Sequence, residues 1–362
     1  MGTGTDRAQL RVLALLGKAP GAVEIYRITL PFMNLNNHSN MRCGWMTIGD
    51  AVQRLQQMRT DVVFNNDLIV LHRSISDVPD AGEALIEALR VRGAKVVYET
   101  DDDYSGRHRE SHSQREGLSW LPYLPYVDAA TVTTKTLAQV VEQDSNGKPV
   151  YVVPNAIDYQ WFTEAAREAG RTDPRLTVML AGTKTHYDDW KVVGEVMPGI
   201  LADHPDVRFV VAGDWMSYDY LNWVEHKIPP VHYTGYPAVL AQADILCAPL
   251  VPDDPFNACK SPIKAIEGWC AARQVGKTRE GGCALIATKA VAYRGTVQNR
   301  HNGLLVDHTP EAWDKALRLL IQDEHLRRKL QVEGLKDARQ YDIATRWRDW
   351  HTTYTRIAGG AI

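Results

Sequence analysis

Short apolar runs alternate with amphipathic segments along the whole chain, and this alternation limits the folds that it can adopt. Each run has the length of a buried strand, and each segment between runs is long enough for a crossover helix. Such alternation predicts an α/β fold with parallel sheets and helices on both faces. Strands are expected at residues 12–16, 67–72, 95–100, 130–133, 150–153, 176–181, 208–212, 231–234, 244–248, 284–287 and 304–306.

The length of 362 residues exceeds that of one typical domain, so two domains are expected. The polar, glycine-containing stretch 165–174 is the expected hinge. We therefore predict an N-terminal domain over 1–165, a C-terminal domain over 166–341 and a final helical segment over 342–362. Helices are expected at residues 47–58, 80–91, 310–322, 324–340 and 343–357.

Composition narrows the classes of function. A formal net charge of -3 gives no bulk attraction to nucleic acid or to anionic membranes. No stretch approaches the roughly 18 apolar residues that a membrane helix requires, and no signal peptide is evident. The five cysteines lack paired metal-ligand spacing, and their odd number favours reduced thiols. The sequence thus predicts a cytoplasmic protein without integral membrane contact, bound metal or required cofactor.

The stretch from Phe256 to Glu267 carries the strongest functional signal. Ser261 followed by Pro262 predicts an N-cap and the first position of a helix. Lys260, Lys264 and Glu267 then share one stripe of that helix. Two lysines at a helix start repel each other and oppose the helix dipole, whereas a bound phosphate would compensate both effects. The alternative is a solvated surface with a Lys264–Glu267 pair.

With the apolar runs at 243–250, 284–288 and 302–306, this stretch resembles the donor half of a GT-B glycosyltransferase. The chain is most similar to the retaining, family-4-like nucleotide-sugar transferases of bacteria and phages, clearly over 150–341 and more loosely before it. The resemblance implies two Rossmann-like domains facing a central cleft. It also implies a C-terminal helix that crosses back to the N-terminal domain.

In that family a Glu-x7-Glu motif binds the donor, and its second glutamate holds the ribose diol. Glu267 matches the second position, but Cys259 stands at the first, which puts the identity of the sugar in doubt. Some relatives carry Asn-x-x-Lys-Ser-x-x-Lys-x-x-Glu instead, and this chain matches that version from Asn257 to Glu267.

Ligands of open parallel sheets bind beyond the carboxyl ends of the strands. A glycine turn after the strand 176–181 exposes backbone N–H groups to a diphosphate. Lys184 and Lys191 add positive charge there, unless His186 and Asp189 simply cap the helix and Lys191 is solvated. The predicted donor-binding residues are Gly182, Thr183, Lys184, His186, Lys191, Asp214, Asn257, Lys260, Ser261, Lys264 and Glu267.

The N-terminal half suggests an acceptor side. The turn at 17–22 precedes a pattern similar to relatives with a Tyr-Arg-Ile-x-x-Pro segment, although Arg27 has the alternative of pairing with an acid in its own domain. The polar run 105–115 lies where GT-B enzymes hold acceptors, or it is only a surface loop. The predicted acceptor residues are Gly21, Tyr26, Arg27, Asp103, Arg107 and Arg109.

Three carboxylates follow the strand 95–100, and they allow two mechanisms. Asp101 and Asp103 have the spacing of the metal-binding pair in a GT-A transferase. Alternatively, Asp101 or Asp102 orients the acceptor hydroxyl or acts as a base. A purely structural role, with Arg107 and Arg109 as partners, is a third reading.

The sequence therefore predicts a glycosyltransferase of hexosyltransferase type that moves a sugar from a UDP- or GDP-sugar to a hydroxyl. The resemblance implies retention without a protein nucleophile, with Lys184, Lys260 and Lys264 stabilising the leaving diphosphate. The predicted catalytic residues are Asp101, Asp102, Lys264 and Glu267. The acceptor is a saccharide or cell-surface glycan, or a hydroxymethylated pyrimidine in phage DNA. The alternatives are a metal-dependent GT-A-like transferase and a non-catalytic protein that binds nucleotide sugars.

Overall fold

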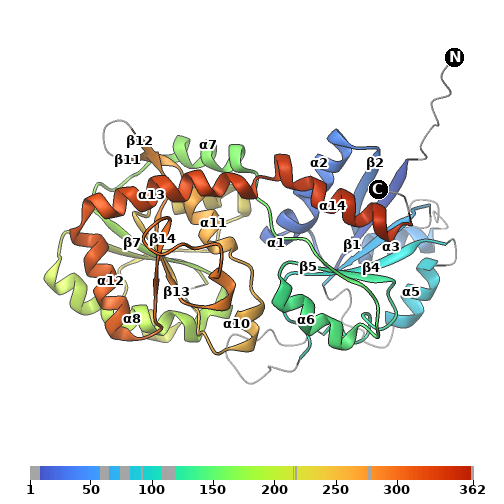
Figure 1. Cartoon of the computed structure of the whole chain (residues 1–362), viewed down its shortest axis with the longest axis horizontal. Coiled ribbons are helices and arrows are strands. Elements are labelled where there is room, and N and C mark those ends of the chain that lie inside the picture. Colours follow the sequence, from blue (N-terminus) through green and yellow to red (C-terminus); the bar gives the residue numbers. More distant parts are fainter. Residues whose placement is uncertain are drawn as a thin grey trace, which may run out of the picture. The chain divides into compact units, whose positions relative to one another are not determined.

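Two compact units make up the chain in the computed structural model (Figure 1). The described residues are 9–57, 65–73, 82–90, 93–106, 119–214, 216, 218–275 and 279–359. Unit 1 holds the described residues up to Ala156 together with those from Ile343 onward, and unit 2 runs from Ile157 to Asp342. The chain thus enters unit 2 once and returns to unit 1 at its end.

Unit 1 is built on a six-stranded parallel sheet with the order β2-β1-β3-β4-β5-β6. The chain passes from β1 to β2 on one side and then crosses to β3 on the other, so the topological switch point lies between β1 and β3. The strands are β1 Leu10–Leu16, β2 Met41–Thr47, β3 Leu68–His72, β4 Lys95–Thr100, β5 Ala129–Val132 and β6 Val150–Val152. The helices are α1 Ala22–Glu24, the π-helix η1 Ile25–Thr29, α2 Leu30–His38, α3 Ile48–Gln56, α5 Gly82–Arg90, α6 Lys135–Asp144 and α14 Ile343–Ile357.

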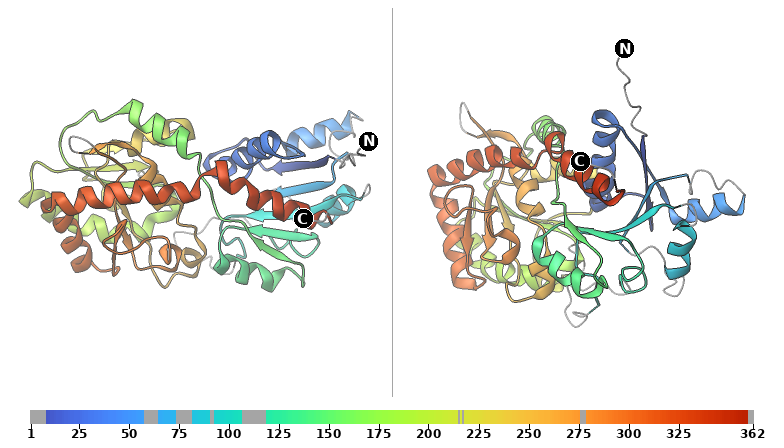
Figure 2. Two further views of the ribbon diagram at one scale, coloured as in Figure 1. Left: turned by 45° about the horizontal axis from the view of Figure 1, so that its top comes forward. Right: turned by 45° about the vertical axis from the view of Figure 1, so that its right-hand side comes forward.

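The last helix, α14, packs against α2 within unit 1, as both views of Figure 2 show. The ring of Phe32 meets that of Tyr354 edge to face at 6.3 Å between centroids, and His38 stacks on Trp347 at 5.8 Å. Aromatic contacts of this kind add to the free energy gained by burying the rings. Trp347 and Tyr354 of α14 are therefore part of the core of unit 1.

Unit 2 has a second six-stranded parallel sheet, with the order β14-β13-β10-β7-β8-β9. Its switch point lies between β7 and β10, because β8 and β9 follow β7 on one side and β10 pairs on the other. The strands are β7 Thr177–Gly182, β8 Arg208–Gly213, β9 His226–Ile228, β10 Ile245–Ala248, β13 Ala284–Thr288 and β14 Gly303–Val306, with an antiparallel pair β11 Arg273–Val275 and β12 Arg279–Gly281.

Helices surround this second sheet. One core joins α8 and α12 to the strands through buried side chains such as Trp190 and Trp313, while α11 and α13 contact each other and β13. The helices are α7 Tyr159–Ala169, η3 Lys184–His186, α8 Tyr187–Asp203, η5 Asp219–Leu221, η6 Tyr233–Gly235, α9 Tyr236–Leu240, α10 Pro255–Cys259, α11 Ile263–Cys270, η7 Val291–Tyr293, α12 Pro310–Gln322, α13 Glu324–Ala338 and η8 Arg339–Tyr341.

These two parallel sheets confirm the predicted α/β class, but some elements differ from the prediction. The strand expected at 231–234 is wrong: β9 lies earlier, and a 3-10 turn begins at Tyr233. Pro229 and Pro230 separate the two, and proline cannot donate to a strand ladder. The edge strand β2 was missed, because its sequence contains Gly44 and exposed polar positions.

The expected hinge at 165–174, with a domain boundary at 165/166, is also wrong, because those residues begin inside α7. Asp158 caps this helix by accepting a hydrogen bond from the Trp161 N–H at 3.0 Å. Trp161 then stacks on Tyr233 at 5.0 Å between ring centroids, which fixes α7 to unit 2. The units accordingly meet in sequence between Ala156 and Ile157.

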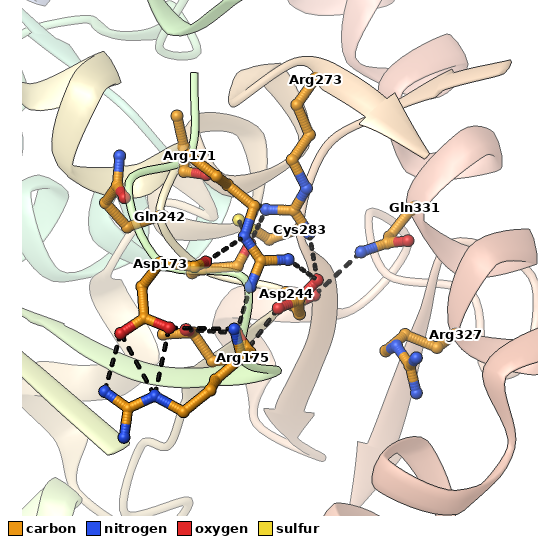
Figure 3. Close-up of polar contacts among 12 residues, drawn as sticks. Arg171, Asp173, Arg175, Gln242, Asp244, Arg273, Cys283, Arg327 and Gln331 are labelled. Carbon is orange, nitrogen blue, oxygen red and sulfur yellow. Dashed lines mark hydrogen bonds and ion pairs between the residues drawn. The ribbon is translucent and has the colours of Figure 1, made fainter. Parts of the chain in front are cut away.

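A network around Asp244 fixes the amino ends of the central strands of unit 2 (Figure 3). Its Oδ1 accepts hydrogen bonds from Arg171 at 2.9 Å and from Arg273 at 2.8 Å, and its Oδ2 accepts one from the Thr177 N–H at 2.8 Å. Figure 3 shows both guanidinium groups pointing to this carboxylate from different segments. Structural ion pairs therefore occupy the amino ends of these strands. The candidate site lies at their carboxyl ends.

Candidate functional site

The carboxyl ends of β7 and β8 approach each other so closely that only glycine fits. A Cβ added at Gly213 would lie 1.9 Å from the carbonyl oxygen of Gly182, and Gly213 has a φ of +105°. The Asp214 N–H donates to that same carbonyl at 3.2 Å. The predicted donor residues Gly182 and Asp214 are thus brought together by the two strand ends.

Asp189, in the first turn of α8, joins the segments that follow β7 and β10. Its Oδ2 lies 2.8 Å from the Nδ1 of His186. Its Oδ1 accepts hydrogen bonds from the Val251 N–H and from the Nδ2 of Asn257, both at 2.7 Å. Asp189 and Asn257 are each 1% exposed. The two sides of the switch point are therefore connected through one buried carboxylate.

The protonation of this pair follows from its surroundings. Burial, followed by Lys260, lowers the pKa of His186 to about 4, although Asp189 opposes the shift. Burial disfavours ionisation of Asp189, but His186 and Lys260 outweigh it and lower the pKa of the carboxyl. At neutral pH the imidazole is therefore neutral and the carboxylate charged. Since Nδ1 faces Asp189, it carries the hydrogen, and Nε2 holds a lone pair.

The helix α11 begins at Ile263 with Pro262 at its N-cap, so the predicted N-cap at Ser261 is wrong by one residue. The carbonyl of Pro262 accepts from the N–H groups of Ala265 and Ile266, at 3.0 and 3.3 Å. Proline tolerates this position because it has no N–H that needs an acceptor. Ser261 lies in the segment that leads into the helix.

Lys264 forms a partly buried network with Glu267 and Tyr236. Its ammonium lies 3.2 Å from the Oε2 of Glu267 and donates to the hydroxyl of Tyr236 at 2.8 Å. Burial opposes the charge of Lys264, but Glu267 and Tyr236 outweigh it and raise its pKa. The charge of Lys264 is thus compensated within the protein by the Lys264–Glu267 pair that the alternative reading gave, and a contact of Lys264 with a diphosphate stays a prediction.

The ammonium group nevertheless keeps capacity for a ligand. Among the described residues, Glu267 and Tyr236 are the hydrogen-bond partners of Lys264, and an ammonium has three N–H groups. Lys260 lies close by, with its Nζ 5.1 Å from the centre of the Phe256 ring. Both lysines are near enough to His186 to influence its pKa. The structure therefore brings four predicted donor residues together in unit 2, namely His186, Lys260, Lys264 and Glu267.

The remaining predicted donor residues differ in their environments. Lys191 pairs with Asp188 at 2.9 Å, lies over the Tyr187 ring and is 46% exposed, so the solvated alternative describes it. Thr183 is exposed and lies 3.2 Å from Thr185, oxygen to oxygen. The backbone of Lys184 forms part of η3. Lys191 is thus removed from the candidate diphosphate ligands.

In unit 1, Arg27 is a structural residue and not an acceptor contact. It is 0% exposed, and its guanidinium bonds both oxygens of Glu99, at 2.7 and 3.1 Å. It also donates to the carbonyl of Val153 at 2.6 Å and lies 5.1 Å from the centre of the Trp350 ring. The alternative that Arg27 pairs with an acid of its own domain is the correct one. Tyr26 is likewise buried.

Asp101 is held by Arg73, a residue that sequence reasoning did not single out. The guanidinium donates to both carboxylate oxygens, at 2.7 and 2.8 Å. The predicted partners Arg107 and Arg109 lie outside the described residues. Within the described part of the chain, no three His, Cys, Asp or Glu residues are grouped as a metal site. Asp103 is buried, and its Oδ1 accepts from the Ser105 N–H at 2.8 Å.

Further residues converge at the switch point of unit 1, beyond β1 and β3. Glu24 accepts a hydrogen bond from the Gly21 N–H at 2.9 Å, and its other oxygen lies 3.6 Å from Arg73 and 3.7 Å from His72. Arg73 has a φ of +59°, which is uncommon outside glycine. His72 is the last residue of β3 and Arg73 follows it directly, so the strand-end rule would have found both.

Comparisons with known proteins agree with this architecture. Residues 174–323 match the family described as glycosyl transferases group 1. A phosphatidyl-myo-inositol mannosyltransferase of Mycobacterium tuberculosis is 23% identical over 243 residues, which are 63% of this chain and 60% of that protein. The chain thus spans 60% of the length of the curated relatives it matches.

Solved structures resemble the whole chain. Anabaena HepE, crystallised with UDP and glucose, has a TM-score of 0.65 at 14% identity and covers 96% of this chain and 100% of its own. Sucrose-phosphate synthase from Thermosynechococcus elongatus has a TM-score of 0.66 at 11% identity, covering 97% and 99%. These likenesses confirm the predicted GT-B fold and exclude the GT-A fold. No described helix has both the length and the apolar character to cross a membrane.

Proposed function

We propose that this chain, a GT-B glycosyltransferase of the family-4-like type, moves a sugar from a nucleotide-diphosphate sugar to an acceptor hydroxyl with retention of configuration. One observation carries the proposal: Lys264, Glu267 and Tyr236 form a partly buried network at the start of α11, with Lys260 and His186 near it. The network lies within the stretch that matches the glycosyltransferase family.

The roles of these residues follow from their charge. Lys260 and Lys264, with Lys184 in the preceding turn, stabilise the negative charge that develops on the leaving diphosphate. Glu267, which is 5% exposed and aligned by Lys264, binds the ribose diol. The donor is a UDP- or GDP-sugar. The presence of UDP and glucose in the HepE structure supports UDP-glucose as the first candidate.

The acceptor side belongs to unit 1. Asp101, aligned by Arg73 at the carboxyl end of β4, or the adjacent Asp102 orients the acceptor hydroxyl. The acceptor is a saccharide or cell-surface glycan, or a hydroxymethylated pyrimidine in phage DNA. The curated relative acts, by its name, on a lipid-linked inositol, and this supports a polyhydroxylated ring as acceptor.

Substitutions at the network test the donor site. Because Lys264 and Glu267 neutralise each other, any neutral substitution leaves the partner's charge uncompensated. Glu267→Gln and Lys264→Gln are preferred to alanine, because glutamine retains most of the side-chain volume and can still form hydrogen bonds. Both should lose transfer, measured as nucleotide release at limiting donor, while circular dichroism shows an intact fold. Lys191→Gln, at a surface lysine of the same unit, is the matched control and should retain activity. Near wild-type turnover of either network variant would exclude this assignment.

Two other readings give different results in the same assay. A metal-dependent transferase that uses Asp101 and Asp103 would lose activity in EDTA and with Asp103→Asn, whereas the proposed mechanism retains activity in EDTA. A non-catalytic binding protein would bind UDP-glucose but release no UDP, with or without acceptors. Cys259, at the position of the first motif glutamate, is the feature that favours this last reading.

A further inference from the structure

We infer that His186, aligned by Asp189, takes up a proton from solvent when the diphosphate of a nucleotide sugar binds at the carboxyl end of β7. The inference rests on the proposed function, because it assigns a proton-linked role to one residue of the proposed donor site.

The first step is the position of the imidazole. A Cβ added at Gly182 would lie 2.9 Å from the Cδ2 and 3.5 Å from the Nε2 of His186, so this edge of the ring lies over the last residue of β7. The opposite nitrogen, Nδ1, is bound to Asp189 at 2.8 Å. The ring also stacks on Trp190, with an angle of 2° between the planes. The side chain is 17% exposed, so solvent and ligands reach it.

The second step is the set of charges around the ring. Asp189 faces it from α8, Lys260 from the end of α10 and Lys264 from α11. The Tyr218 hydroxyl accepts a hydrogen bond from the backbone N–H of His186 at 3.1 Å and does not contact the ring nitrogens through this bond. Two lysines oppose a third positive charge here, and one carboxylate favours it. Together with burial, this balance keeps the unliganded imidazole neutral, with its pKa at about 4.

The third step is the effect of the ligand. The diphosphate of a nucleotide sugar is esterified at both ends, so it brings two negative charges and no phosphate group that titrates near neutrality. Negative charge next to an imidazole favours its protonated form. The bound diphosphate would therefore raise the pKa of His186 from its value in the unliganded protein.

Protonation also improves the contact itself. In the neutral ring, the lone pair of Nε2 would face phosphate oxygens, which are acceptors as well. After proton uptake, Nε2–H donates to a phosphate oxygen while Nδ1–H continues to donate to Asp189. Such charge-assisted hydrogen bonds are about twice as strong as neutral ones. Asp189 is thus a positioning residue, since it acts on the ligand through His186.

Proton uptake is measured by calorimetric titration with UDP-glucose, and with GDP-mannose as a second probe, in buffers of different ionisation enthalpy. The dependence of the observed enthalpy on that of the buffer gives the number of protons bound. We expect net proton uptake on donor binding at pH 6 and less uptake at pH 8.5. Binding should be tighter at pH 6 than at pH 8, because the pKa of His186 is higher in the complex.

Variants assign the proton to its residue. His186→Gln should abolish both the uptake and the pH dependence, and Asp189→Asn should reduce the uptake. The matched control is His204→Gln, at the carboxyl end of the same helix α8, which should behave like the wild type. Should His186→Gln not fold, ¹⁵N spectra of histidine-labelled wild-type protein at pH 6 give the same answer, since Nε2 changes from an acceptor to an N–H on binding.

The outcomes separate the inference from the proposed function. Binding of either probe without proton uptake, or uptake that persists in His186→Gln, overturns the inference and leaves the donor site intact. Failure of both probes to bind overturns the proposed function, and the inference falls with it. Uptake in the wild type and in His204→Gln, but not in His186→Gln, is the supporting result.

Discussion

Replacing Asp244 by alanine should destabilise unit 2 more than any loss of a surface ion pair. Its carboxylate is the shared acceptor for Arg171, Arg273 and the Thr177 N–H. Arg273 is 6% exposed, so the substitution leaves a buried cation without its counter-charge. Removing one partner of a buried ion pair costs about 3–5 kcal/mol. The unpaired Thr177 N–H adds to this cost, because it is buried as well.

The expected size can be tested directly. For a domain of 150–250 residues each kcal/mol lowers Tm by about 2–4 °C, so Asp244→Ala should lower the transition of unit 2 by about 6–20 °C. Scanning calorimetry resolves that transition, and urea unfolding followed by tryptophan fluorescence should show a lower midpoint with an unchanged slope. Asp244→Asn retains an acceptor for the Thr177 N–H but loses the negative charge. Its Tm should therefore lie between those of the wild type and Asp244→Ala.

The control is Arg167→Ala, which breaks an exposed ion pair with Glu280 in the same unit. Exposed pairs contribute about 0–1 kcal/mol, so this variant should change Tm by no more than a few degrees. If Asp244→Ala changed the Tm as little as Arg167→Ala does, the claim that the Asp244 network stabilises unit 2 would be refuted.

Other predictions follow from single contacts. Gly213→Ala should disrupt the end of β8 and lower the yield of folded protein, because its Cβ would overlap the carbonyl of Gly182; a normal calorimetric transition would contradict this. Arg27→Met should destabilise unit 1 by about 3–5 kcal/mol in urea, since it leaves buried Glu99 unpaired. All five cysteines are buried, so a thiol reagent should label the protein only on unfolding, and rapid labelling of the native protein would argue against this packing. Burial opposes ionisation of Glu24, but His72 and Arg73 outweigh it and lower its pKa. Ionised Glu24 therefore stabilises the native state at neutral pH, and this contribution is lost as the pH falls below about 4.5. In Glu24→Gln, the free energy of unfolding should therefore depend less on pH in that acid range.

Sequence patterns predicted the elements that depend on local information. The strand from Lys95 to Thr100 and the helix from Pro310 to Gln322 have the predicted ends. The strand has three consecutive β-forming residues at its centre, and the helix has Thr309 as its N-cap. The strand β2 has neither signal, since it lies at the edge of its sheet and includes exposed residues. Local rules therefore recovered the interior strands and the edge strands β6 and β14, but they missed β2 and misplaced β9.

Site residues on a single helix were predicted from the sequence. Contacts between residues far apart in the sequence were missed. Lys264 and Glu267 are three residues apart on α11, and their pairing is readable from the sequence. Arg27 was misassigned, because its partner Glu99 lies 72 residues away and no local pattern reveals the pair. The central role of Asp189 was missed for the same reason, since its partners Val251 and Asn257 follow another strand.

The two buried aspartates of unit 2 explain why one edge of its sheet is structural and the other is suited to chemistry. Asp244 binds arginines, whose guanidinium groups stay charged at every physiological pH, so its ion pairs form a permanent support. Asp189 binds a histidine instead, and the charge of that partner depends on what lies on the far side of the ring. An arginine in place of His186 would hold the diphosphate in the same way before and after the reaction. A histidine gains affinity for the anion when it is protonated and loses it when the proton leaves. His186→Arg should therefore slow release of UDP and lower kcat more than it lowers kcat/KM. This result would distinguish a side chain whose charge changes with protonation from one that is always positive.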